Sequence, residues 1–315
     1  MFLAAVLAVT PVMTLSAEPA PTPGLPPARL ERAPLHFGLT TSAFRGVNAN
    51  DAGVALQLLA QTIGKQRGYA IDTSTRVFED TKSCEAAINR GGLSLVILNA
   101  QEYLSMDVPG LKPAFVHLEQ GVVLKDYLLL TRRDSGYESL ADLRGRDIVL
   151  LSGGEGRLTT TWLEVLLRED GLGPSGAFFQ RILSESNPAL TVLPVFFGTK
   201  SACIVDRMSF KTMVELNPQV GRQLRPIAIS DPYIDSITCI PLQIETTPQA
   251  RLDLIRTLND LHQTVAGRQI LTLFKVDQLV PFQDQYLDAA RRLRAKAIRL
   301  GILPLAQTAA ASVPP

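Results

Sequence analysis

The sequence has few of the residues on which most enzymes depend. Its 315 residues include three cysteines and three histidines, and no two cysteines form a CxxC pair. It also lacks the GxSxG, HExxH and GxxxxGK[ST] motifs of hydrolases, zinc peptidases and P-loop proteins. Nucleophilic catalysis needs an activated side chain with a base, and metal binding needs clustered ligands. We therefore expect no catalytic residue, no metal and no cofactor.

An excess of charge of either sign is also missing. Lysine and arginine number 31 against 30 aspartates and glutamates, which gives a net charge of +1. Without a basic field the chain is not expected to bind nucleic acid. The apolar share of 46% is enough for a core of ordinary size. A chain of this length suggests one large domain or two smaller lobes, and two lobes are the better interpretation.

The N-terminal apolar run is too short to cross a membrane. Phe2 to Ala17 ends in small residues and contains Pro11, whereas a spanning helix needs about 20 apolar residues. Residues 1–17 are therefore interpreted as a signal peptide and residues 18–34 as a proline-rich linker, although no basic residue precedes Arg29. An uncleaved anchor is the alternative. Both interpretations place the folded part outside the cytoplasm, and we expect a periplasmic protein.

The cysteines leave two possibilities open. Cys84, Cys203 and Cys239 are an odd set without a nearby histidine. Cys203 and Cys239 both lie in strand-like runs, and a disulfide between them is compatible with export. Buried free thiols are the other interpretation.

Strand-like and helix-like segments alternate beyond the linker. The strand-like segments are Leu35 to Leu39, Thr73 to Phe78, Leu93 to Leu98, Asp147 to Leu151, Ala202 to Val205 and Leu224 to Ile229. Asn50 is the expected N-cap of the first helix, and Thr247 with Pro248 predicts the start of a later one. The last helix carries a basic side that is expected to face solvent. Such alternation predicts an α/β fold with mostly parallel sheets flanked by helices, followed by a flexible tail over residues 304–315.

A glycine-rich loop suggests the kind of site. Ser152-Gly153-Gly154-Glu155-Gly156 follows the apolar strand Asp147 to Leu151 and precedes an amphipathic helix. Such a loop offers unpaired backbone N–H groups at a helix N-terminus, which suit an anion or a polar small molecule.

Two longer motifs identify a family. Asp134-Ser135-Gly136 with Leu140-Ala141-Asp142-Leu143-Arg144-Gly145-Arg146 and the strand that follows resembles substrate-binding proteins of the phosphate/phosphonate ABC-transporter type. The run from Val195-Phe196-Phe197-Gly198 to Glu215-Leu216-Asn217-Pro218-Gln219 resembles a branch of the same superfamily. The similarity in element order extends from about Leu35 to Gly301.

The resemblance implies the two-lobed type II periplasmic-binding fold with two hinge crossings. Lobe one would comprise residues 35–126 and 238–303, and lobe two residues 127–237. Gln120 to Lys125 and Ser236 to Leu242 would be the crossings. Ligands of open α/β sheets lie at the carboxyl ends of strands.

Loops at such strand ends supply the candidate ligand contacts. In lobe one they are Thr40, Thr41, Ser42, Phe44, Asn99, Gln101 and Tyr103, of which Tyr103 matches a ligand-contacting tyrosine of the family. In lobe two they are Ser152, Gly153, Gly154, Arg157, Thr159 and Thr160, with Asn187 and Arg207 as weaker additions. The threonines have helix capping as an alternative role, and Trp162 is expected in the core.

Departures from the family pattern leave the ligand open. Phosphonate binders have a Ser-Thr-Ser run where this chain has Glu155-Gly156-Arg157, and a family histidine is absent near Asn187. Arg157 would suit a carboxylate, sulfonate or phosphate. The leading hypothesis is a monomeric binding protein that delivers a small anionic or zwitterionic ligand to an ABC permease. Alternatives are a ligand-sensing partner of a membrane signalling protein and, less favoured, an enzyme on the same fold.

Overall fold

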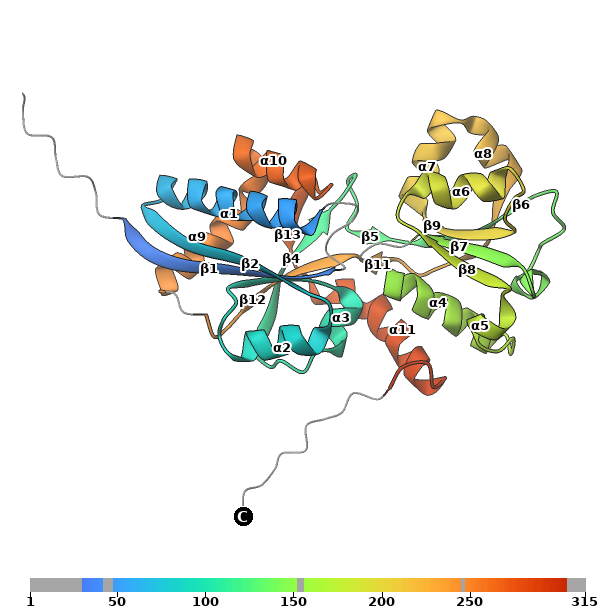
Figure 1. The fold of residues 1–315 in the computed structure, drawn as a ribbon, viewed down its shortest axis with the longest axis horizontal. Helices are drawn as coiled ribbons and strands as arrows, with labels where there is room; N and C mark the ends of the chain where they lie inside the picture. Colours follow the sequence, from blue (N-terminus) through green and yellow to red (C-terminus); the bar gives the residue numbers. More distant parts are fainter. Residues whose placement is uncertain (1–29, 42–47, 152–155, 245–246, 305–315) are drawn as a thin grey trace, which may run out of the picture.

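The chain folds into two lobes, each built around one β-sheet (Figure 1). The computed structural model describes residues 30–41, 48–151, 156–244 and 247–304. The sheet of lobe one has the order β13-β4-β12-β3-β1-β2, and that of lobe two the order β10-β6-β9-β7-β8. A two-stranded ribbon, β11-β5, lies between them.

The strands of lobe one come from two separate parts of the chain. They are β1 (Glu31–Thr40), β2 (Tyr69–Phe78), β3 (Leu95–Asn99), β4 (Leu111–Leu118), β12 (Ser236–Pro241) and β13 (Gln278–Pro281). The strands of lobe two are β6 (Tyr127–Arg132), β7 (Asp147–Leu151), β8 (Arg181–Glu185), β9 (Ala202–Asp206) and β10 (Leu224–Ile229). The ribbon is formed by β5 (Leu124–Lys125) and β11 (Tyr233–Ile234).

The direction of each strand follows from its place relative to the crossings. β1 pairs in parallel with β2 and β3, and β7 pairs in parallel with β8 and β9. These strands all end at the edge that faces the other lobe. β6 and β12 each begin at that edge, directly after a crossing, and therefore run antiparallel to their neighbours. β13 also runs antiparallel to its neighbour β4, yet four of the described strands in each sheet point the same way, which confirms the predicted α/β class, with sheets of mixed pairing.

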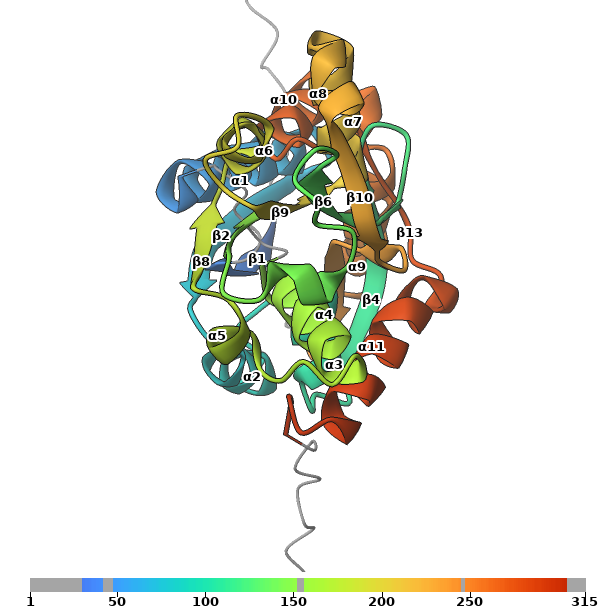
Figure 2. The same ribbon diagram turned by 90° about the vertical axis from the view of Figure 1, so that its right-hand side faces the viewer.

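Helices cover both faces of each sheet. In lobe one, α1 (Ala49–Gln66), α9 (Pro248–Asn259) and α10 (Val265–Leu273) pack on one face, and α2 (Thr81–Asn89) and α3 (Ala100–Ser105) on the other. In lobe two, α6 (Pro188–Phe196), α7 (Arg207–Leu216) and α8 (Pro218–Gln223) lie opposite α4 (Gly156–Glu169) and α5 (Ser175–Phe178), as Figure 2 shows. Short 3-10 turns occur at Leu140–Leu143, Leu261–Gln263 and Asp284–Leu287.

The core alternates between sheet faces as strand geometry requires. Leu128 and Leu130 of β6 pack toward α6 and α8, whereas Leu129 of the same strand packs with Trp162 of α4. Trp162 is buried, as the sequence predicts. The cluster around Leu129 is continuous with buried residues of lobe one, so the two lobes share apolar contact. No helix of the described ranges has both the length and the apolar composition to cross a bilayer.

Three local expectations differ from the structure. β1 begins at Glu31, so the first strand is longer than Leu35 to Leu39. The N-cap of α1 is Asn48 rather than Asn50, because the Asn48 carboxamide oxygen accepts the backbone N–H groups of Asn50 and Asp51. Most of Ser236 to Leu242 forms β12, which pairs with both β3 and β4. A strand held on both sides cannot act as a free hinge, and the return crossing lies before it, at β11.

Candidate functional site

The carboxyl ends of the parallel strands bring part of the expected lobe-one wall together. Thr40 ends β1 and Asn99 ends β3, and both side chains are buried. The Thr40 hydroxyl donates to Glu102 Oε2 at 2.7 Å, and the Asn99 backbone N–H donates to the same oxygen at 3.0 Å. Asn99 Oδ1 in turn accepts the Glu102 backbone N–H at 2.8 Å, which completes a capping box at the start of α3. Thr40 and Asn99 thus orient α3.

Helix α3 carries Gln101 and Tyr103 from that wall. Gln101 Nε2 donates to Thr161 Oγ1 at 3.0 Å, which joins α3 of lobe one to α4 of lobe two. Gln101 Oε1 is buried and has no hydrogen-bond partner among the described residues. The Tyr103 ring is half-buried against the shared core, and this burial raises the pKa of its hydroxyl. We call the contact between α3 and α4 the lobe contact. It contains one oxygen, Gln101 Oε1, that could accept a further hydrogen bond.

Among the described residues, the main candidate contacts of lobe two fall on the first turns of α4, which follows β7. Thr159 and Thr161 are buried and Thr160 is exposed. Ser152, Gly153 and Gly154 lie outside the described residues, as do Ser42 and Phe44 of lobe one. Arg157 belongs to the first turn of α4, but the position of its side chain is not among the described features. Thr41, next to Thr40, is exposed.

The two weaker candidates have structural roles. Asn187 is the N-cap of α6, where its Oδ1 accepts the Ala189 backbone N–H at 2.8 Å. Arg207 pairs with Asp126 through its guanidinium, with NH2 2.5 Å from Asp126 Oδ2. This hydrogen-bonded carboxylate raises the pKa of Arg207. The pair fixes the start of α7 to the residue that precedes β6.

A buried lysine at the crossings was not anticipated from the sequence. Lys125 of β5 is 6% exposed, and its Nζ lies 2.5 Å from Glu119 Oε2 and 3.2 Å from Asp235 Oδ2. β5 pairs with β11, and the rings of Tyr127 and Tyr233 stack beside the ribbon with centroids 6.3 Å apart. Both crossings are therefore linked by backbone pairing, ring stacking and one cation. The sequence placed Lys125 in the first crossing but did not predict its partner. Asp235 is 110 residues away along the chain, and a local sequence pattern cannot indicate a pair so far apart.

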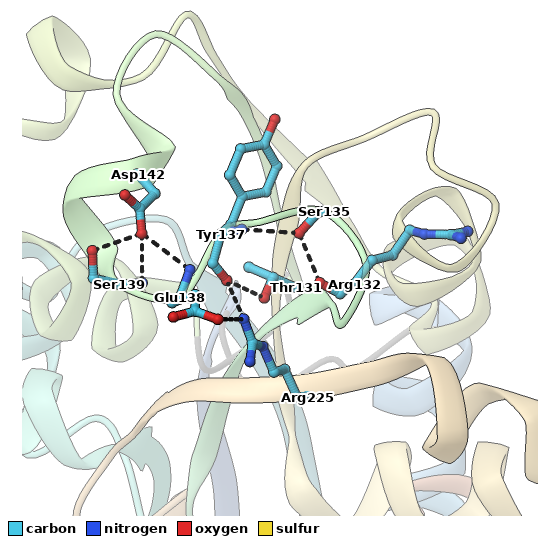
Figure 3. Close-up of polar contacts among 8 residues, drawn as sticks. All are labelled: Thr131, Arg132, Ser135, Tyr137, Glu138, Ser139, Asp142 and Arg225. Carbon is cyan, nitrogen blue, oxygen red and sulfur yellow. Dashed lines mark hydrogen bonds and ion pairs between the residues drawn. The ribbon is translucent and has the colours of Figure 1, made fainter.

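The family motif at Asp134 to Arg146 is a structural turn at the far end of β6. Figure 3 shows the Thr131 hydroxyl donating to the Tyr137 carbonyl at 3.1 Å, and Arg225 contacting the same carbonyl at 3.3 Å. Asp142 accepts the Ser139 backbone N–H at 2.8 Å and its hydroxyl at 2.8 Å, which lowers the pKa of Asp142. β6 begins at the crossing and ends at this turn, so the motif connects β6 to β7 at the end of the sheet away from lobe one.

Helix α11 (Asp288–Arg299) is a third element between the lobes. It packs against α3 of lobe one and α4 of lobe two, with Ala290 and Leu293 buried (Figure 2). Lys296 pairs with Glu169 of α4 at 2.9 Å, and Arg292 with Asp231 at 3.3 Å. The basic side of this helix faces solvent as expected, with Arg291, Arg292 and Arg299 exposed. Arg292 and Lys296 also form their ion pairs with the segment between residues 127 and 237 at this surface.

The described cysteines show no activated thiol. Cys84, Cys203 and Cys239 are free and buried, and burial raises the pKa of all three, that of Cys84 to about 12. Cys203 lies in β9 and Cys239 in β12, strands of different sheets, so the possible disulfide between them is not formed. Within the described ranges, no three His, Cys, Asp or Glu residues gather as metal ligands would.

Comparison with known sequences gives one family. A sequence model of that family matches residues 48–287, which is most of the chain. Its description is the periplasmic substrate-binding protein of a phosphonate ABC transporter. No curated protein sequence matches the chain.

Solved structures share the fold at low sequence identity. A Xanthomonas citri protein bound to ATP is 15% identical with a TM-score of 0.61, covering 85% of this chain and 98% of that one. PhnD1 of Prochlorococcus marinus in complex with methylphosphonate is 13% identical with a TM-score of 0.55, covering 86% and 99%. A binding-protein component of an ABC phosphonate transporter from Pseudomonas aeruginosa is 14% identical with a TM-score of 0.56, covering 85% and 87%. At these identities the likeness shows the fold alone.

Proposed function

The chain belongs to the family of periplasmic substrate-binding proteins of phosphonate ABC transporters, and we propose that it captures a small anionic or zwitterionic solute between its lobes and delivers it to a permease. The description of this family is that of substrate-binding proteins, and we propose that this chain releases its ligand unchanged. For this chain we propose that the site lies between the lobes, that the ligand is a small anion or zwitterion, and that the lobes close when it binds.

The main support for this proposal is the position of the Gln101 carboxamide between the lobes. The carboxamide donates from α3 to Thr161 on α4, and its other polar atom, Oε1, is buried without a partner among the described residues. A buried acceptor without a donor is unfavourable, and an ammonium or hydroxyl group carried by a zwitterionic or hydroxyl-bearing anion would relieve that cost, while the anionic oxygens bind elsewhere in the site. The position is therefore suited both to sensing lobe closure and to contacting a bound molecule.

The surroundings favour an oxyanion. α4 has 14 residues and begins at the carboxyl end of β7, so its first N–H groups are directed toward the lobe contact. Thr159, Thr160 and Thr161 add hydroxyls in its first two turns. Such groups stabilise phosphonate, phosphate, sulfonate or carboxylate oxygens without selecting strongly among them. We propose Arg157 as the cation of this wall, because its guanidinium would bind two oxygens of the ligand.

The other predicted residues divide into proposed ligand contacts, proposed supporting residues and residues that are not proposed as primary contacts. Thr41, Tyr103 and Thr160 have exposed or half-buried side chains near the strand ends and stay proposed contacts, together with Ser42, Phe44, Ser152, Gly153 and Gly154 of the flanking loops. Thr40, Asn99 and Thr159 are buried, and we propose that they support the wall. Asn187 caps α6 and Arg207 binds Asp126, so neither is proposed as a primary contact.

A thermal-shift panel tests this proposal. The mature protein is heated with phosphate, methylphosphonate, alkanesulfonates, carboxylates and amino compounds in parallel. A ligand at 100 times its dissociation constant is expected to add about 2.7 kcal/mol to the free energy of unfolding. We expect at least one oxyanion to do so and the simple amines to fail.

Two controls make the result specific. Arg157→Ala should weaken binding of the effective oxyanion, whereas Arg168→Ala near the end of the same helix should not, because that residue is exposed and distant from the first turn. Mass spectrometry of the recovered ligand should show an unchanged compound. Conversion of the ligand would contradict a pure binding role, and equal affinity of both arginine variants would place the anion elsewhere.

Export is the last part of the proposal. Residues 1–17 lie outside the described structure, and we propose that they direct the chain to the periplasm and are removed. N-terminal sequencing of the protein isolated from a periplasmic fraction tests this directly. A sequence that still begins at Met1 would favour a retained anchor.

A further inference from the structure

Lobe one contains an apolar cavity that the proposed function does not use. It lies between the sheet and helices α1, α9 and α10, and its volume is about 150 Å³. Figure 1 shows α1 and α10 on the same side of this sheet. Its lining is mainly aliphatic and aromatic, and includes Leu35, Phe37, Leu59, Ile97, Leu258 and Phe274. We call this space the lobe-one cavity.

The cavity is separate from the lobe contact. It includes Ala33, Pro34 and Leu35 at the start of β1, and Tyr69 and Ile71 at the start of β2. The parallel strands end at the edge near lobe two, so these residues lie at the opposite end of the sheet, and the cavity runs from there toward Ile97 and Thr238 near the inner edge. None of the proposed ligand contacts lines the cavity. A molecule held there would therefore occupy a second site.

Two buried hydroxyl residues line this space, Ser94 and Thr238, and the Ser94 hydroxyl accepts the His36 backbone N–H at 3.1 Å. Thr238 of β12 lines the cavity and is 1% exposed. It is opposite Ile97 of β3 in the sheet register, and Ile97 also lines the cavity, which places both side chains on the same face. Thr238 Oγ1 has no hydrogen-bond partner among the described residues. Buried polar groups are almost always paired, so an unpaired hydroxyl in an apolar wall indicates a missing partner.

The outer end of the cavity is polar. The Tyr69 hydroxyl donates to Asp253 Oδ2 at 2.8 Å, and both residues belong to the lining. Arg67 also lines this end and is exposed. The cavity thus leads from charged groups near solvent to a mainly apolar interior whose lining also includes Ser94, His117 and Thr238. This gradient fits a molecule with an apolar body and one polar group directed inward.

We propose that the lobe-one cavity binds a small neutral molecule of about one aromatic ring, whose hydroxyl or carbonyl pairs with Thr238. The size follows from the volume, because a cavity of roughly 150 Å³ lined by leucine, isoleucine and phenylalanine accommodates benzene. The neutral charge follows from the lining, because an unpaired charge in such surroundings is strongly unfavourable. The class of ligand is therefore opposite to the oxyanion proposed for the lobe contact.

Phenol and benzene are matched probes for this site. Their affinities for the mature protein are measured by ligand-observed NMR, with a separate thermal shift as a check. Phenol should bind about fivefold more tightly than benzene, which is the ratio expected of one net hydrogen bond. In Thr238→Val the ratio should fall to about one while benzene still binds. If neither probe binds the wild-type protein near its solubility limit, the proposal is overturned.

A second variant tests the location. Leu59→Phe places a larger side chain in the cavity and should abolish binding of both probes, while the oxyanion-induced thermal shift remains. If the variant binds benzene as the wild type does, the probes occupy another place and the proposal is wrong. If this variant does not fold, methyl NMR of the wild-type protein can show instead whether the probes occupy the lobe-one cavity. Benzene must then shift the Ile97 and Leu258 methyl signals, and unchanged signals overturn the site.

Discussion

Gln101 Nε2 donates to Thr161 Oγ1 at 3.0 Å, and this bond joins α3 of lobe one to α4 of lobe two. Both helices begin where a parallel strand ends at the inner edge of its sheet. The bond therefore depends on the separation of the lobes, unlike the hydrogen bonds that hold each sheet together. We therefore expect the Gln101 bond to be made in the closed form and lost when the lobes separate.

Removing this bond should weaken the closed form. In Gln101→Leu and Thr161→Val the donor and the acceptor are lost, and a double-mutant cycle should give a coupling of about 0.5–1.5 kcal/mol in ligand-bound stability. Binding of the effective oxyanion should become about three- to tenfold weaker in Gln101→Leu. Calorimetric titration measures the affinity, and thermal unfolding of the ligand-bound single and double variants measures the coupling. Thr212→Val, an exposed change on α7, is the matched control and should leave affinity unchanged.

Removing the buried Lys125 cation at the crossings should lower the free energy of unfolding by more than loss of the Gln101 bond does. Lys125→Met leaves Glu119 and Asp235 close together without the Nζ group that lies between them. Breaking such a buried pair from one side typically costs about 3–5 kcal/mol. Urea unfolding of the purified variant measures the change. Lys211→Met removes an exposed pair with Glu215 and serves as the control, for which little change is expected. Equal stability of Lys125→Met and wild type would show that this cluster does not hold the ribbon.

Protonation of Asp147 at low pH should lower the stability of lobe two. Hydrogen bonds from Arg181 and Lys200 hold the pKa of Asp147 at about 2, below the value of about 3.9 for an unfolded aspartate. Because the folded pKa is lower, this stabilisation is complete above about pH 4 and is lost as the pH falls toward 2. Melting temperatures measured across this window should fall less steeply in Asp147→Asn than in the wild type. Parallel curves would mean that Asp147 does not titrate with folding.

The thiols should be unreactive in the folded protein. All three cysteines are buried and free, and burial raises their pKa values, so little thiolate forms near neutral pH. Ellman's reagent should detect none before unfolding and all three after unfolding without reductant. Detection of only one thiol after unfolding would reveal a disulfide.

Local sequence patterns predicted the elements that depend on local chemistry. Asp147 to Leu151 and Leu224 to Ile229 are strands with the predicted bounds, because aliphatic residues predominate in both short segments. Thr247 caps α9 as expected, with its hydroxyl accepting the Ala250 backbone N–H. The two-lobed class followed from alternation and from the resemblance of the motifs. Those motifs report the fold, since the Asp134 to Arg146 turn lies away from the lobe contact.

Contacts between distant parts of the chain could not be predicted in this way. The Lys125 cluster joins residues separated by 110 positions, and the Gln101 bond joins residues separated by 60. Gln101 was a candidate because it follows a strand, but its partner Thr161 was not distinguished from its neighbours. Glu102, which binds Thr40 and Asn99, was not considered, because a glutamate early in a helix usually faces solvent. Burial decides these roles, and it depends on the assembled fold.

The lobe separation itself gives the most direct test of the central claim. Spin labels at Gln61→Cys on α1 and Glu215→Cys on α7 occupy exposed positions in different lobes, and the native thiols are buried. Double electron–electron resonance then measures the distance between them with and without the oxyanion that stabilises the protein. The account predicts a shift to one shorter and narrower distribution on binding. An unchanged distribution with ligand bound would contradict closure of the lobes as the mechanism of capture.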